Sequence, residues 1–163
     1  MPIHFTSLEF KQRQDVASAA ISSKGLDAIL LFAPESHYWL TGYDTFGFSL
    51  FQTMVLTCKG DIHLLTRAPD LRQALYTSTL SEDHIHIWDE VEGANPAKDL
   101  AKLLSELGLT KGKIGYESQT VGLTDFNGRL LRDAIPHLQD IADLMLNLRR
   151  IKSSAELAMH QKA

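Results

Sequence analysis

The sequence predicts an α/β fold in which helices cover the faces of a mixed β-sheet. Short apolar segments alternate along the chain with segments of helical periodicity, and one pair of strands is separated by a tight turn. Of the 163 residues, 44% are apolar, which is enough to build a sizeable core around one sheet. Alternating helices and strands with one hairpin among them favour a mixed sheet over a purely parallel one.

The first predicted helix covers residues 7–24. Thr6 and Glu9 have capping-box spacing, and Gly25 can supply a left-handed stop. The predicted core face of this helix consists of Phe10, Val16, Ala17, Ala20 and Ile21. The following apolar run, residues 26–32 (LDAILLF), is typical of a central strand that is buried on both faces.

A β-hairpin is predicted from residues 50–57 and 62–67, because the glycine in Cys58-Lys59-Gly60-Asp61 suits a tight turn. A short helix then begins near Pro69, with Leu71, Ala74 and Leu75 as its apolar residues. The alternating segment HIHIW, residues 84–88, predicts the next strand.

The second half continues the series of helices and strands. Asn95 is a good N-cap, Pro96 fits the first helical position, and Gly108 ends a helix whose core stripe is Leu100, Leu103, Leu104 and Leu107. Residues 113–117 predict a strand, and Thr124 can cap a helix that carries Phe126, Leu130, Leu131 and Ala134. Pro136 stops that helix before a last predicted strand, HLQDIA, at residues 137–142.

Charge and composition exclude several classes of function. Lys and Arg number 16 against 20 Asp and Glu, so no overall field attracts nucleic acid. The charged amino-terminal residues do not resemble a signal peptide, and no apolar run is long enough to cross a membrane. Cys58 has no partner for an internal disulfide, and we interpret it as a buried structural thiol in a cytoplasmic protein.

The sequence patterns indicate no self-contained active site. His84 and His86 share a face of the predicted strand, but zinc needs a third and usually a fourth ligand, so we favour two surface histidines. The histidines at positions 37, 63, 137 and 160 are scattered singly. Neither a nucleophile elbow nor a phosphate-binding glycine pattern is present, and the paired acids lie beside predicted turns. We therefore expect no catalytic residue and no metal site in these 163 residues.

The carboxyl-terminal tail differs from the rest. Ser153 and Glu156 form a capping box at the start of a helix, just after the basic cluster of Arg149, Arg150 and Lys152. A basic cluster can bind an anion, but at an interdomain junction it is more typically solvated or paired with acids of the next domain.

Three segments resemble, in order, the amino-terminal domain of the creatinase, prolidase and aminopeptidase P family. They are HYWLTGYD (residues 37–44), LLTRAPD (residues 64–70) and LRRIKSSAELAMHQKA (residues 148–163), the last of which is similar to the family's Arg-x-Ile-Lys-Ser-x-x-Glu junction. The resemblance covers essentially the whole chain. It implies a ribonuclease-H-like motif in residues 1–148, followed in residues 149–163 by a linker and the first helix of a catalytic domain.

The same resemblance implies a "pita-bread" catalytic domain in the same polypeptide, with two divalent metals (Mn, Co or Zn) held by two Asp, one His and two Glu. It also implies a homodimer. None of those metal-ligand motifs occurs in these 163 residues, so no cofactor is expected in this part of the protein.

The most interesting segment is the loop at residues 41–49. Its aromatic residues, glycines and single carboxylate suit recognition by aromatic contact with one polar handle. In the resembled family this region lies near the active site, in many members near that of the partner subunit. We hypothesise that Tyr43, Asp44, Phe46 and Phe48 shape a substrate pocket; the alternative is that the aromatic residues complete the domain's own core.

By resemblance, the expected function is that of a non-catalytic amino-terminal domain, serving dimerisation and substrate selection in an Xaa-Pro dipeptidase or aminopeptidase. A creatinase-like or ectoine-hydrolase-like enzyme that cleaves another C–N bond remains an alternative, because the fold is shared. Two further alternatives are a stand-alone binding or dimerisation module and a stand-alone hydrolase that uses the histidines.

Overall fold

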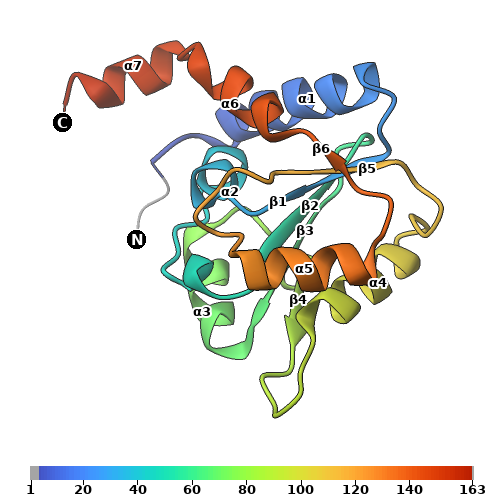
Figure 1. Ribbon diagram of the computed structural model, residues 1–163. Coiled ribbons are helices and arrows are strands. Elements are labelled where there is room, and N and C mark those ends of the chain that lie inside the picture. The colour runs from blue at the N-terminus through green and yellow to red at the C-terminus, as the bar shows by residue number, and fades with distance from the viewer. Residues whose placement is uncertain (1–3, 163) are drawn as a thin grey trace.

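The computed structural model describes residues 4–162 and confirms the predicted α/β architecture (Figure 1). The elements in chain order are α1 (Ser7–Ser23), β1 (Ala28–Leu31), α2 (Pro34–Thr41), the 3-10 turn η1 (Gly47–Ser49), β2 (Thr53–Thr57), β3 (Ile62–Arg67), α3 (Ala68–Thr77), the 3-10 turn η2 (Glu82–His84), β4 (Ile85–Trp88), α4 (Pro96–Glu106), β5 (Ile114–Tyr116), α5 (Asp125–Ala134), β6 (Gln139–Asp140), α6 (Ala142–Arg150) and α7 (Ser154–His160).

The strands form one mixed sheet in the order β4-β3-β2-β1-β5-β6. β2 pairs antiparallel with both β1 and β3, whereas β5 pairs parallel with β1, and β6 with β5. The antiparallel set β1–β3 extended by two parallel strands is the ribonuclease-H-like motif that the resemblance implies. β4 adds a parallel edge strand outside β3.

Each face of the sheet carries its own hydrophobic core. In β1, Ile29 and Leu31 point to the core covered by α1, α2, α3 and α6, while Ala28 and Leu30 point to the core beneath α4 and α5. This alternation follows from the two-residue period of a strand. Figure 1 shows α1 and α6 above the sheet and α4 and α5 below it. Helices on both faces explain why β1 is apolar at every position.

Local signals predicted the helix starts well. The side chains of Thr6, Asn95 and Thr124 accept hydrogen bonds from first-turn amides of α1, α4 and α5. At Ser153 both halves of the predicted capping box form. The hairpin turn is also confirmed. Gly60 has a φ of +96°, a backbone angle that residues other than glycine rarely adopt.

Some predicted core positions are wrong. Val16 is 53% exposed, because the buried stripe of α1 runs through Phe10, Arg13, Ala17 and Ile21 at spacings of three and four residues. Val16 lies outside that stripe. On α5, Phe126 is also exposed, whereas Leu131, predicted on the same helix, is fully buried in the core.

The predicted last strand is much shorter than expected. Only Gln139 and Asp140 pair, because β6 is an edge strand that contacts two residues of β5. The chain then turns into α6, a helix that the sequence patterns did not indicate. α6 buries Leu144 and Met145 against the core shared with α1. Within residues 4–162, no helix is both long and apolar enough to cross a membrane.

His63, His84 and His86 form a cluster. The sequence pattern paired His84 with His86 but gave no sign that His63 lies beside them. The His63 ring centroid lies 4.7 Å from that of His84 and 5.2 Å from that of His86, and His63 Nδ1 lies 3.1 Å from His86 Nε2. Burial, together with these two neighbours, lowers the pKa of His63 from 6.5 to about 4. Across all described residues, no three His, Cys, Asp or Glu side chains are arranged to hold a metal ion.

The lowered pKa of His63 predicts acid sensitivity. The folded state binds this proton less tightly than the unfolded chain, so the stabilisation is complete above pH 6.5 and is lost as pH falls toward 4. Because solvent screens this partly buried cluster, we expect a loss of roughly 1 kcal/mol in the free energy of unfolding from His63 between pH 7.5 and pH 5.

Urea titrations at both pH values, followed by tryptophan fluorescence, measure this loss. His63→Gln is expected to remove most of the His63 contribution, whereas the exposed His137→Gln retains it. An equal pH dependence in the wild type and His63→Gln contradicts the assignment. The fully buried His37, whose pKa burial also lowers to about 4, contributes equally to both proteins and cancels in the comparison.

Candidate functional site

A groove of about 510 Å³ lies between α2 and the segment that connects α6 to α7. We call it the α2–α7 groove. Its lining residues are Pro34, Glu35, Tyr38, Trp39, Tyr43, Asp44, Thr45, Arg149, Lys152, Glu156 and His160. The groove therefore combines two segments about one hundred residues apart in sequence, the predicted loop and the predicted basic junction.

α2 supplies the aromatic side of the groove. Pro34 occupies the first turn of this helix, and Gly42 ends it in the left-handed conformation with a φ of +81°. A Cβ atom at Gly42 would lie 3.0 Å from the Thr77 carbonyl oxygen and 3.1 Å from the Phe10 ring, so the turn requires glycine for space as well as for backbone angle.

Of the four predicted loop residues, two line the groove and two do not. Tyr43 lines the groove but is completely buried; its ring stacks on His37, and its hydroxyl accepts a hydrogen bond from Gln52 Nε2 at 2.8 Å. Asp44 lines the groove and is exposed. Phe46, 87% exposed, and the half-buried Phe48 do not line it. Tyr43 thus also completes the core, as the alternative interpretation held.

Glu117, which the sequence patterns did not indicate, does not line the groove but holds the start of α2, the helix that forms one of its walls. It follows β5 and is 4% exposed. One carboxylate oxygen accepts from the backbone N–H groups of Phe32 and Ala33, and the other accepts from the Ser36 hydroxyl at 2.6 Å. Glu117 therefore satisfies amides at the start of α2, where Ala33 offers no side-chain cap. Burial raises its pKa, while the hydrogen bond from Ser36 opposes that shift.

Arg149 of the basic cluster faces the same point. Its Nη1 donates to Ser36 Oγ at 3.1 Å, and its charge acts on Glu117. Arg149, at the end of α6, thus contacts α2 through Ser36 and faces the carboxylate of Glu117. Lys152 and Arg150 are exposed, which agrees with the prediction that cations of this cluster are solvated.

The start of α7 is attached to α1 by a second set of polar contacts. Ser153 Oγ donates to Glu9 Oε1 at 2.6 Å, and Arg13 Nε donates to the same oxygen at 3.1 Å. Arg13 is only 5% exposed; its Nη1 also donates to the Trp39 carbonyl, and its Nη2 lies 3.8 Å from Glu156. Through Arg13, the amino-terminal helix, α2 and α7 share one polar centre.

The groove carries charges of both signs above an aromatic floor. The partly exposed Tyr38 supplies most of the aromatic surface, and the buried rings of Trp39 and Tyr43 lie beneath it. Glu35, Asp44 and Glu156 offer carboxylates, and Arg149 and Lys152 offer cations. Such a surface suits a small zwitterion with an apolar middle, because each charged end finds a partner of opposite sign. Binding and positioning are the roles that these side chains can perform.

Comparison with known proteins places the chain. A sequence model of the Creatinase/Prolidase N-terminal domain matches residues 13–151, which is most of its length. The chain belongs to this family. The predicted resemblance to creatinase/prolidase N-terminal domains is confirmed.

Individual relatives of this creatinase/prolidase domain are distant. The chain is 28% identical to the ectoine hydrolase of Halomonas elongata, covering 94% of this chain and 40% of that protein. It is 24% identical to the hydrolase/peptidase y4tM of Sinorhizobium fredii, over 99% and 43%. The structure of dipeptidase PepE from Mycobacterium ulcerans superposes with a TM-score of 0.73 at 23% identity, covering 94% of this chain and 40% of that one. The chain spans less than half the length of these relatives.

Proposed function

We propose that this chain is the non-catalytic amino-terminal domain of a metal-dependent hydrolase that cleaves Xaa-Pro dipeptides or related peptides. The family match over residues 13–151, in a chain that spans about 40% of its relatives, carries the proposal. The reaction belongs to a pita-bread catalytic domain in the same polypeptide. Two divalent metals in that domain would activate water and polarise the scissile carbonyl.

Among residues 4–162, no three His, Cys, Asp or Glu side chains are arranged to hold a metal ion. The role proposed for this part of the protein is recognition. In the proposal, the α2–α7 groove forms one wall of the substrate pocket. Asp44 binds the substrate's ammonium group, because it is an exposed carboxylate beside the aromatic floor. Phe46 and Phe48 lie outside the groove, and as exposed or half-exposed aromatic residues they suit closure of a pocket on a partner subunit in a homodimer. The single half-buried cysteine fits a cytoplasmic location.

Kinetics of the full-length protein test the role of Asp44. We expect Asp44→Ala to raise KM for an Xaa-Pro dipeptide about tenfold, which is the effect of losing one interaction of about 1.4 kcal/mol. The value of kcat and the metal content should not change, because the metals lie in another domain. Asp125→Ala on α5 is the matched control, since this carboxylate is 80% exposed and far from the groove in sequence and element.

Unchanged kinetics in Asp44→Ala contradict the substrate-facing role. A native protein that turns over no Xaa-Pro peptide and carries no catalytic domain supports the alternative of a stand-alone binding module. The similarity to ectoine hydrolase favours one second candidate, a hydrolase for a small cyclic C–N substrate. A substrate panel that contains both Xaa-Pro dipeptides and ectoine distinguishes the two.

A further inference from the structure

A second cavity lies on the other side of the sheet from the α2–α7 groove. It has a volume of about 380 Å³ and lies between α4, α5 and the amino ends of β5 and β6. We call it the α4–α5 cavity. α2 begins at the carboxyl end of β1, and β1 runs parallel to β5. The groove therefore lies near the carboxyl ends of these two strands, and the cavity lies near the amino end of β5.

The walls of the α4–α5 cavity are in large part aliphatic. The aliphatic lining residues are Ala101, Leu104, Leu109, Ile114, Ala134, Ile135 and Pro136, and the remaining lining residues are Thr110, Lys111, Gly112, Lys113, His137 and Gln139. No lining residue is Phe, Tyr or Trp. A cavity of this volume falls within the range of small-molecule sites and has room for roughly a dozen non-hydrogen atoms. Its volume and its aliphatic lining residues therefore suit a short hydrocarbon chain.

The wall formed by residues 109–113 is held in place by backbone hydrogen bonds. The Leu109 amide donates to the Leu104 carbonyl at 2.7 Å, and the Gly112 amide donates to the Leu109 carbonyl at 2.9 Å. The Lys113 amide donates to the Asp27 carboxylate at 2.8 Å, and the Asp27 amide donates to the Lys113 carbonyl at 2.8 Å. Because this wall is already ordered, a ligand does not have to order it, and binding costs less entropy.

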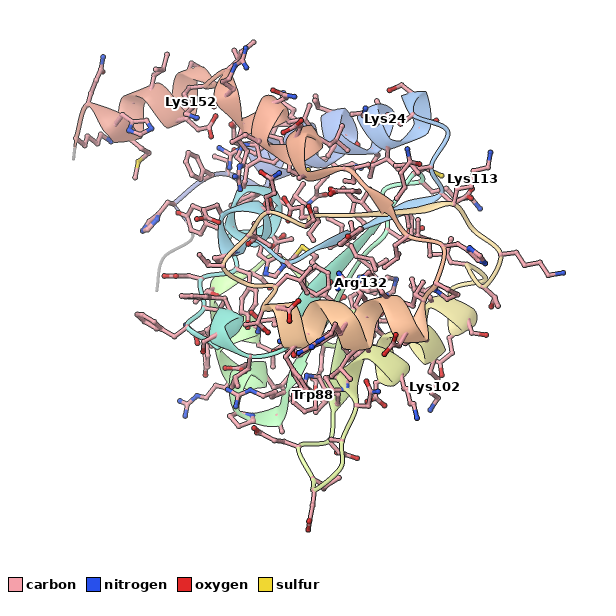
Figure 2. The ribbon with its side chains drawn as sticks, viewed as in Figure 1. Lys24, Trp88, Lys102, Lys113, Arg132 and Lys152 are labelled. Atoms are coloured by element: carbon pink, nitrogen blue, oxygen red, sulfur yellow. The ribbon has the colours of Figure 1, made fainter. Side chains whose placement is uncertain are left out.

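Two lysines make the solvent-facing part of the cavity basic. Lys111 and Lys113 line the cavity and are exposed, and no Asp or Glu is among the lining residues. Neither lysine forms an ion pair with any described residue. In a protein with a net charge of −4, unpaired cations beside an aliphatic cavity favour an anionic ligand head. Figure 2 shows Lys113 on the loop that enters β5, and Lys102 on α4.

We propose that the α4–α5 cavity binds a medium-chain aliphatic carboxylate. Its hydrocarbon chain lies between Leu104, Ile114 and Ala134, and its carboxylate lies at the mouth beside Lys111 and Lys113. This site is independent of the proposed peptidase pocket, because none of the residues that line the cavity also lines the groove. The ligand would occupy the domain without blocking the substrate-facing wall.

Titration of the 163-residue chain with octanoate and with 1-octanol tests this proposal. Isothermal calorimetry should show octanoate binding at least tenfold more tightly than the neutral alcohol, because only octanoate offers a charge to the lysines. Methyl-resolved NMR should show the largest shifts at Leu104, Leu109 and Ile114. No binding of octanoate at millimolar concentration, or equal affinity for octanol, overturns the proposal.

Charge reversal locates the carboxylate. The double variant Lys111→Glu with Lys113→Glu should weaken octanoate at least tenfold. Both side chains are exposed, so the variant is expected to fold. Lys102→Glu is the control, because Lys102 also lies in this part of the chain, is 77% exposed and does not line the cavity; its octanoate affinity should stay within twofold. An unchanged affinity in the double variant contradicts the proposed position of the head group.

Discussion

Replacing Gly122 by alanine is expected to lower the free energy of unfolding by about 3 kcal/mol or more. A Cβ atom at this position would lie 2.0 Å from the carbonyl oxygen of Phe32, a separation far below contact distance. The obstacle is backbone at the end of β1, between the buried strand and the start of α2, and it cannot rotate away as a side chain does. Either the loop that carries Gly122 or the end of β1 has to shift.

Gly128→Ala is the matched control for this prediction. Gly128 lies inside α5, and a Cβ atom there meets only the tip of the Arg132 side chain, at 3.2 Å. Alanine should raise the free energy of unfolding by about 0.5–1 kcal/mol, because glycine is a poor helix former. Urea denaturation followed by fluorescence of Trp39 and Trp88, both mostly buried, measures the two variants. A Gly122→Ala protein as stable as the wild type would show that the approach to Phe32 is not tight.

Replacing Glu117 by alanine is expected to cost about 3 kcal/mol of the free energy of unfolding. The change removes the acceptor for the Phe32 and Ala33 amides and for the Ser36 hydroxyl, all at the start of α2. Buried donors without partners lose their hydration and receive nothing in exchange. Arg149 would also lose the charge that faces it.

Glu117→Gln should cost roughly half as much. Its amide oxygen can still accept from one set of donors, whereas its NH₂ group faces the others without an acceptor. Glu92→Ala, at an exposed position, should change the free energy by less than about 0.5 kcal/mol. Hydrogen exchange at Phe32 and Ala33 adds a local readout, because both amides should exchange faster in Glu117→Ala. Normal stability and normal protection in that variant would mean that other acceptors replace the carboxylate.

The parts of the fold predicted from sequence are those with local causes. α1, α4, α5 and α7 begin at the expected capping residues, and the β2–β3 hairpin turns at Gly60, because these signals lie within a few residues of the structure that they determine. The short length of β6 and the presence of α6 have no such local signal. β6 exists only through two pairs with β5, and α6 through burial of Leu144 and Met145 against a core assembled from distant segments.

The candidate site was predictable in its parts but not as an assembly. Aromatic residues around a Thr-Gly turn indicated the loop, and clustered cations indicated the junction. Their common groove depends on contacts across the chain, such as the hydrogen bond from Arg149 to Ser36. Glu117 offered a weak signal, as an acid directly following the apolar strand KIGYE. Its carboxylate was not recognised as buried because its partners are backbone amides 84 and 85 residues away.

The two attachments of the α6–α7 segment have a mechanical consequence. Arg149 is tied to the start of α2, and Ser153 is tied to Glu9 of α1, so the elbow between the last two helices is clamped on both sides. These contacts determine the direction in which α7 leaves the body of the molecule. A polypeptide continuing from α7 would therefore start in a direction determined by Glu9, Arg13 and Arg149.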